Sequence, residues 1–346
     1  MLVRSRAPLR LGLAGGGTDV SPYSDEFGGC VLNATIDMFA NCTIEQTDTG
    51  LIEFAAPDLG LHFSIHSKES LSLEGDLVLH KAVYNRIVAD FNRGNPLSLR
   101  VTTYSDAPPG SGLGSSSTIV VAMLSAYREL LKLPLGEYDL AHLAYVIERE
   151  DCRLSGGKQD QYAATFGGFN FMEFYKDDKV IVNPLRVRPH IVNELQSSLL
   201  LYFTGVSRDS ALIIEDQIHT VASETSGGVA LEAMHEVKRL SMGMKESLLR
   251  GSIEGIIELF KGAWDAKKRM SKKISNENIE SVANTALAAG AKAIKVSGAG
   301  GGGFMMIFVD PIDRLSVIQA LSKYNGQCHR FQFTEKGAES WRVTQP

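Results

Sequence analysis

The chain lacks most of the features that would place it outside the ordinary globular enzymes. It has no stretch of about 18 uncharged apolar residues and no apolar run at its start, so neither a membrane-spanning helix nor an export signal is expected. Its four cysteines form no Cys-x-x-Cys pair, which favours free thiols. A net charge of -5 provides no basic excess for nucleic acid. We therefore predict a cytoplasmic protein that binds neither membranes nor nucleic acids.

Glycine, by contrast, is abundant, with 33 residues. The phosphate loop, residues 107–118, reads Ala-Pro-Pro-Gly-Ser-Gly-Leu-Gly-Ser-Ser-Ser-Thr and lacks the Gly-Lys-Ser/Thr of a Walker A loop. Apolar residues at helical spacing follow it, so its hydroxyl groups lie at a helix N-terminus, where backbone N–H groups and the helix dipole favour a phosphate. An ordinary loop with a serine N-cap would need only one of these serines. The candidate nucleotide-binding residues are Pro109, Gly110, Ser111, Gly112, Leu113, Gly114, Ser115, Ser116 and Ser117.

A second glycine-rich segment, the glycine loop of residues 297–303, separates two predicted strands. Five of the six residues 298–303 are glycine. Glycine has a high entropic cost and no side chain to pack, so a backbone that must approach a ligand explains this run best.

A third glycine cluster is the first-motif loop, residues 15–19, which reads Gly-Gly-Gly-Thr-Asp. It follows a predicted strand over residues 2–13 that Pro8 interrupts. The spacing is not Gly-x-Gly-x-x-Gly and no helical pattern follows directly, which argues against a dinucleotide-binding Rossmann unit.

Together the three loops resemble the three motifs of the GHMP kinases, named for galactokinase, homoserine kinase, mevalonate kinase and phosphomevalonate kinase. The matching residues of the first motif are Ala7, Pro8, Arg10, Gly15, Thr18 and Asp19. Leu9, Gly16 and Gly17 depart from it, since galactokinase-like members have Gly, Glu and His there. The resemblance spans the whole chain and implies an α+β fold of two domains. These are a ribosomal-protein-S5-like domain over 1–185, with the phosphate loop, and a ferredoxin-like α/β domain over 186–346, with the glycine loop.

The same resemblance implies transfer of the γ-phosphoryl group of Mg-ATP to a small-molecule hydroxyl. Galactokinases carry an acidic residue at the interval that separates Glu148 from Asp160 here. The resemblance implies that Asp160 is the catalytic carboxylate, that Arg10 acts beside it, and that Ser116 and Glu148 hold Mg²⁺. From residue type alone, Glu148 also fits the solvated end of a helix over 137–152. Which serine of 115–117 meets the metal stays open.

For the acceptor sugar, the resemblance implies contacts from the first-motif loop, because the acidic residues of this loop bind sugar hydroxyls in sugar-kinase relatives. Gly16 replaces one of these acidic residues and leaves its space empty. Arg208 either clamps a substrate phosphate or lies on the surface. The basic run over 267–273 is predicted to be a solvated face, with electrostatic guidance of anionic substrates as the alternative. The predicted substrate-binding residues are Gly16, Gly17, Thr18, Asp19, Arg208, Gly300 and Gly301.

Within the family, the segments Arg-Leu-Gly-Leu-Ala-Gly-Gly-Gly-Thr-Asp and Gly-Gly-Lys-Gln-Asp-Gln-Tyr-Ala-Ala resemble the bacterial heptose 7-phosphate kinase branch. That resemblance implies phosphorylation of the anomeric hydroxyl of D-glycero-D-manno-heptose 7-phosphate, for the synthesis of nucleotide-activated heptose. A fucokinase-like or galactokinase-like kinase of an unphosphorylated sugar is the alternative. A sugar- and ATP-binding sensor without turnover should have lost Asp160 or Glu148. A homodimer is left open.

Overall fold

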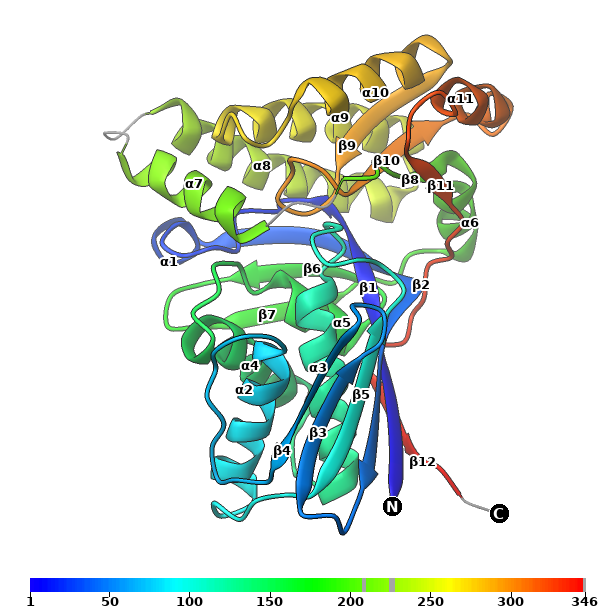
Figure 1. The fold of residues 1–346 in the computed structure, drawn as a ribbon. Helices are drawn as coiled ribbons and strands as arrows, with labels where there is room; N and C mark the ends of the chain where they lie inside the picture. Colours follow the sequence, from blue (N-terminus) through cyan, green and yellow to red (C-terminus); the bar gives the residue numbers. More distant parts are fainter. Residues whose placement is uncertain (207–209, 224–227, 345–346) are drawn as a thin grey trace.

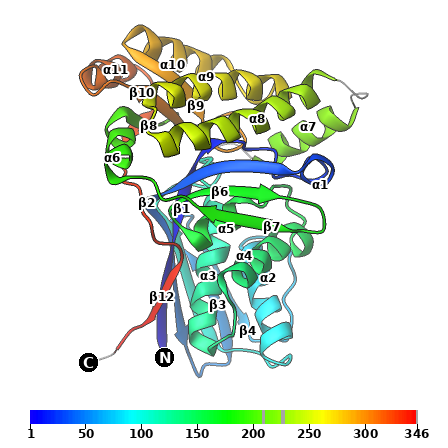
Figure 2. The same ribbon diagram turned by 180° about the vertical axis from the view of Figure 1, so that it is seen from behind.

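The computed structural model describes residues 1–206, 210–223 and 228–344, which form two stacked α/β units (Figure 1). Eight strands of the described chain form the sheet of the first unit, in the order β12-β1-β2-β5-β3-β4, with β6 and β7 joined to it through β2 (Figure 2). Its pairs are antiparallel except β3 with β5. The strands are β1 (Leu2–Ala14), β2 (Gly29–Gln46), β3 (Leu51–Ala56), β4 (Leu61–His66), β5 (Leu99–Ser105), β6 (Phe169–Phe174), β7 (Val180–Pro184) and β12 (Glu339–Arg342).

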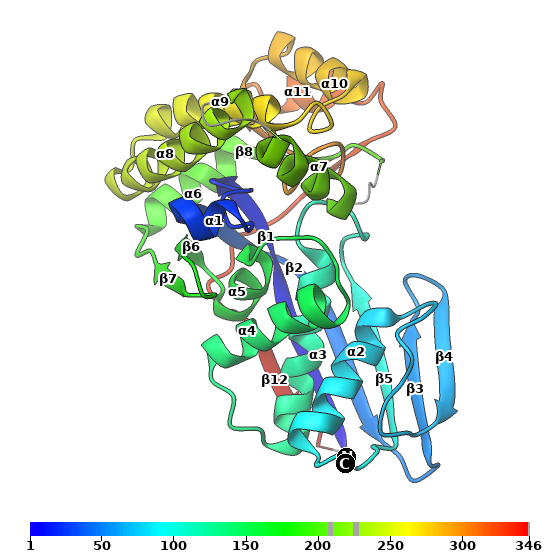
Figure 3. The same cartoon turned by 90° about the vertical axis from the view of Figure 1, so that its left-hand side faces the viewer.

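Helices cover one face of this sheet, and α2 and α3 lie along β3, β4 and β5 (Figure 3). Their apolar residues, among them Val120, Leu124 and Tyr127 of α3, pack against Val101 and Ile44 of the strands. The helices of this unit are α1 (Tyr23–Phe27), α2 (Val78–Arg86), α3 (Ser115–Leu131), α4 (Glu137–Val146) and α5 (Gln159–Phe166), with π-helical turns η1 (Ile87–Phe91) and η2 (Ile147–Asp151) continuing α2 and α4.

The second unit has a four-stranded antiparallel sheet in the order β11-β8-β10-β9. Its central strands are apolar on both faces because both faces are buried. Leu199 and Leu201 of β8 pack toward the first unit, whereas Leu200 and Tyr202 pack beneath the helices of the second unit. Its elements are α6 (Pro189–Ser198), β8 (Leu199–Phe203), α7 (Ser210–Ser223), α8 (Val229–Arg250), α9 (Ile253–Met270), α10 (Glu277–Ala288), β9 (Ala291–Val296), β10 (Phe304–Val309), α11 (Arg314–Leu321) and β11 (Gln327–His329).

The first strand differs from the sequence-based prediction, which interrupted it at Pro8. β1 runs without a break, and its register with β2 shifts between Pro8 and Arg10. Proline has no N–H to donate, so such an irregularity accommodates it within a sheet. The irregularity directly precedes Arg10, the residue of β1 that lines the cavity described below.

The end of the chain departs from the expected division at residue 186. β12 pairs with β1, from Val3 opposite Arg342 to Arg6 opposite Glu339, so these residues complete the first sheet rather than the second unit. A domain boundary near 186 stays a prediction for the chain between β7 and β11. None of the helices in the described ranges combines the length and the apolar character that crossing a membrane requires.

Candidate active site

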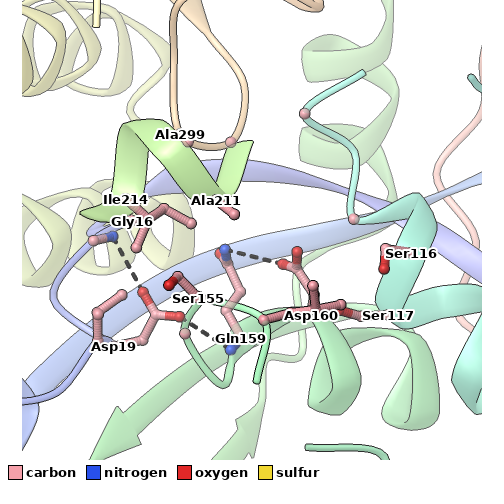
Figure 4. Close-up of a pocket in the computed structure, with 18 of the residues that line it drawn as sticks. Gly16, Asp19, Ser116, Ser117, Ser155, Gln159, Asp160, Ala211, Ile214 and Ala299 are labelled. Carbon is pink, nitrogen blue, oxygen red and sulfur yellow. Dashed lines mark hydrogen bonds between the residues drawn. The ribbon is translucent and has the colours of Figure 1, made fainter. Parts of the chain in front are cut away.

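A cavity of about 460 Å³ lies where the two units meet. Figure 4 shows its first-motif loop, phosphate loop and α5 on one side and α7 and the glycine loop on the other. Among the predicted site residues, those lining it are Arg10, Gly16, Gly17, Asp19, Pro109, Gly110, Gly112, Gly114, Ser115, Ser116, Ser117, Glu148 and Asp160. Three distant segments of the sequence therefore meet in one place, as the three-motif pattern predicted.

The phosphate loop ends on helix α3, whose N-cap is Gly114 with φ +81°. Its close approach to the glycine loop explains Gly112, because a Cβ there would stand 2.5 Å from the carbonyl oxygen of Ser297. The hydroxyl of Ser297 donates to the Gly112 carbonyl at 2.9 Å, and the N–H of Phe304 donates to the Ser111 carbonyl at 2.8 Å. The two loops therefore form one backbone-lined wall beside a helix N-terminus, an arrangement suited to phosphate groups.

Arg10 joins this wall to the predicted catalytic carboxylate. Its Nη1 donates to the Gly112 carbonyl at 2.6 Å, and its Nε donates to Oδ1 of Asp160 at 2.7 Å. The side chain of Arg10 is 4% exposed and that of Asp160 is 23% exposed, so the carboxylate reaches the cavity and the guanidinium lies behind it.

Glu148 is almost fully buried on the π-helical turn η2, which corrects the alternative of a solvated helix end. Ser116 donates to its Oε1 at 3.1 Å and Gln161 Nε2 donates to its Oε2 at 2.5 Å. No basic side chain of the described residues forms an ion pair with it, so its charge is left for a ligand. Gln161, which our sequence analysis did not single out, directly follows Asp160 and orients this carboxylate.

Asp19 also faces the cavity, and backbone N–H groups hold its carboxylate. The N–H groups of Gly17 and Gln159 donate to its two carboxylate oxygens, each at 3.1 Å (Figure 4). A Cβ on Gly157 would stand 1.9 Å from the same carboxylate, which explains the glycine there. Both oxygens retain lone pairs toward the cavity, suited to accepting from hydroxyl groups.

Five predicted binding residues do not line the cavity. Thr18 is buried and its hydroxyl donates to the Gly15 carbonyl at 2.8 Å, which shapes the first-motif loop from behind. Ser111 and Leu113 belong to the phosphate loop but are buried, and Gly300 and Gly301 pack against Ile274. In the glycine loop, Gly298 and Ala299 line the cavity instead. Arg208 lies outside the described residues.

Helix α7 forms the far wall of the cavity with Ala211, Ile214 and Gln217. Gln217 Nε2 donates to the Ala299 carbonyl at 3.2 Å, which ties α7 to the glycine loop. Glu215 accepts from the hydroxyl of Ser155 at 2.7 Å, which ties α7 to the loop before α5. The second of these contacts bridges the two units at the edge of the site.

Lys267 is the site residue that our sequence analysis misread as part of a solvated basic face. It is 3% exposed on α9, lines the cavity, and donates to the Gly298 carbonyl at 2.5 Å. Burial, followed by the nearby charge of Arg10, lowers the pKa of its ammonium to about 8. The helical spacing of the sequence could have predicted that Lys267 is buried. It lies on the same buried face of α9 as Phe260, Ala263 and Met270.

Two family models match the chain, GHMP kinases N terminal domain over residues 78–168 and GHMP kinases C terminal over residues 244–327. D-glycero-alpha-D-manno-heptose 7-phosphate kinase of Campylobacter jejuni is 48% identical over 99% of both chains. The structure titled as a D-glycero-D-manno-heptose 1-phosphate kinase from Bacteroides thetaiotaomicron is 46% identical, covers 99% of this chain and 100% of its own, and superimposes with a TM-score of 0.84.

A more distant relative is the L-fucokinase/L-fucose-1-P guanylyltransferase of Bacteroides fragilis, 26% identical over 96% of this chain and 37% of its own. The whole-length similarity to the heptose kinases and the two family models agree with the arrangement of the three loops around one cavity. They confirm the predicted fold, and the protein is a kinase that belongs to the ATP-dependent GHMP kinase family.

Proposed function

We propose that the protein transfers the γ-phosphoryl group of ATP to the anomeric hydroxyl of D-glycero-D-manno-heptose 7-phosphate, giving the 1,7-bisphosphate. The observation that carries the proposal is whole-length similarity to a heptose 7-phosphate kinase in a chain whose Asp160, Arg10 and phosphate loop line one cavity. ATP makes the cytoplasm the expected compartment, and a homodimer stays a prediction.

In this proposal the phosphate loop binds the triphosphate through backbone N–H groups at the start of α3. Asp160 orients the acceptor hydroxyl and accepts its proton as the new phosphate ester forms. Arg10, held between the phosphate loop and Asp160, provides positive charge where negative charge develops on the transferred group. Asp19 accepts from hydroxyl groups of the sugar.

Glu148 and Ser116 are the residues we assign to Mg²⁺. Described residues of the chain include no cluster of three or more His, Cys, Asp or Glu side chains suited to a metal. One buried carboxylate and one hydroxyl still fit this ion, because Mg²⁺ binds few protein ligands and keeps water and phosphate oxygens. When bound, the ion would neutralise charge on the phosphate oxygens.

The names of the two similar heptose kinases differ in the position of the phosphate on the acceptor, 7-phosphate in one and 1-phosphate in the other. A coupled ADP-release assay with Mg-ATP separates these acceptors from fucose, galactose and mannose, and ³¹P NMR of the product locates the new phosphate. We expect turnover with heptose 7-phosphate and a new phosphate at the anomeric carbon. Turnover only with fucose would keep the kinase and discard this acceptor. Binding of ATP and sugar without turnover would favour a sensor.

A further inference from the structure

The cavity contains one buried cation that forms no ion pair within the described chain. Arg10 is paired with Asp160, but Lys267 has no carboxylate within ion-pair distance in the described ranges and donates only to the Gly298 carbonyl. An ammonium has three donors, so two remain for a ligand. A buried charge without a partner is costly to the folded protein, and such groups are usually paired or bind something.

The space next to this ammonium exists because residue 16 is glycine. A Cβ built on Gly16 would stand 3.5 Å from Lys267 Nζ. A longer acidic side chain at this position, as the galactokinase-like motif has, would occupy the space and pair with the ammonium. Because residue 16 is Gly rather than Glu, the ammonium of Lys267 has no carboxylate beside it. This part of the cavity is therefore suited to binding an anion rather than a sugar hydroxyl.

We propose that Lys267 binds the phosphate group that the sugar acceptor already carries, in the space that Gly16 leaves open, and that this contact selects phosphorylated over free sugars. The inference rests on the proposed function, since it assigns a contact to that substrate. It also assigns the binding of the acceptor's phosphate to a described residue. The sequence analysis considered only Arg208 for this role.

The groups around Lys267 carry charges of both signs. Asp19 and Asp160 raise the pKa of Lys267, whereas burial and Arg10 lower it. Burial, followed by the nearby charge of Lys267, lowers the pKa of Lys295 on β9. Lys295 is itself occupied, because its ammonium donates to the Gly12 and Leu13 carbonyls of β1 at 2.6 and 2.9 Å. A bound phosphate would favour the protonated form of Lys267, because an opposite charge beside an ammonium raises its pKa.

The test compares two neighbouring lysines of α9. Lys267→Met removes the buried ammonium, and Lys268→Met removes a charge one residue away that is one-third exposed and paired with Asp265. Each variant and the parent protein are assayed with D-glycero-D-manno-heptose 7-phosphate and with the free heptose. We expect Lys267→Met to lower kcat/KM for the phosphorylated sugar about 10- to 100-fold through KM, with little change for the free sugar. The Lys268 variant should match the parent.

Two further measurements separate a phosphate clamp from a structural tie to the glycine loop. Calorimetric titration with heptose 7-phosphate in the absence of ATP should show weaker binding to Lys267→Met and to Gly16→Glu. The KM of the parent protein for the phosphorylated sugar should rise as pH increases through about 8, and that rise should be absent from Lys267→Met. Equal losses with both sugars, or a rise in the KM for ATP alone, would overturn the inference while leaving the kinase proposal intact. No turnover of any sugar by the parent would overturn both.

Discussion

Arg10 holds Asp160 by a single carboxylate oxygen. Its Nε and Nη2 both lie 2.7 Å from Oδ1, and Gln159 Nε2 donates to the same oxygen at 3.3 Å. No protein donor of the described chain contacts Oδ2. The carboxylate is thereby fixed in orientation, and one oxygen is left to accept the proton of a substrate hydroxyl.

Replacing Asp160 with Asn should test whether one carboxylate oxygen is held by Arg10 while the other accepts the proton. The amide oxygen can replace Oδ1 in front of Arg10, but the amide nitrogen cannot accept a proton, so kcat should fall about 10²- to 10⁴-fold with little change in the KM for ATP. Steady-state kinetics measure both constants. Asp48→Asn, at an exposed position between β2 and β3, serves as the control. A kcat within a few-fold of the parent would assign Asp160 to positioning alone.

Glu148→Gln should separate metal binding from folding. A glutamine can keep both hydrogen bonds, accepting from Gln161 and donating to Ser116, while it loses the charge that Mg²⁺ requires. The Mg²⁺ concentration for half-maximal activity should rise at least about 10-fold. The Tm without metal should stay the same or increase, because a buried unpaired carboxylate is costly. An unchanged Mg²⁺ dependence would remove Glu148 from the metal site.

Gly112→Ala and Gly50→Ala form a matched pair at positive φ, +81° and +71°. Nothing lies within 4 Å of a Cβ on Gly50, whereas one on Gly112 would collide with Ser297. Both variants should lose about 1 kcal/mol of unfolding free energy from the left-handed backbone. Only Gly112→Ala should lose more and raise the KM for ATP, because it separates the phosphate loop from the glycine loop. Chemical denaturation and kinetics measure the two effects, and equal behaviour of the pair would contradict the close approach.

His80 should make the first unit sensitive to acid. Burial lowers its pKa to about 4, so the unfolded chain binds a proton that the folded chain does not between that value and about 6.5. Stability therefore falls as pH decreases through this range, by up to about 1.4 kcal/mol per pH unit. Urea denaturation at pH 7 and pH 5 should show this fall, and His80→Phe should reduce the difference between the two pH values. An equal pH dependence in both proteins would assign the effect to other groups.

The sequence predicted the three loops, because runs of glycine between apolar segments stabilise neither a helix nor a sheet and so indicate a backbone that approaches a ligand. It failed where one residue fits two structural roles. Lys267 lies in a run of basic residues that indicates a solvated surface, yet helical phase places it inward and its neighbours Lys268 and Arg269 outward. Thr18 matches a binding motif, but its hydroxyl donates to the Gly15 carbonyl and stabilises the turn instead of facing a ligand.

Other features depend on contacts that no local pattern contains. Ser155 and Glu215 meet across the two units, 60 residues apart in sequence. The contact between β12 and β1 joins the two ends of the chain, and neither segment has a pattern that predicts the other. Long-range pairing of this kind is set by the packing of the whole molecule rather than by propensity.

That last strand affects how the protein emerges from the ribosome. β1 precedes and β12 follows every other strand of their sheet in the chain, and the two strands pair at the same end of the molecule (Figure 1). One edge of β1 therefore stays unpaired until β12 is synthesised, and bringing the two strands together has an entropic cost because a long stretch of chain separates them. The elements of the second unit are synthesised between β1 and β12, so the nascent chain has an open sheet edge until β12 has left the ribosome.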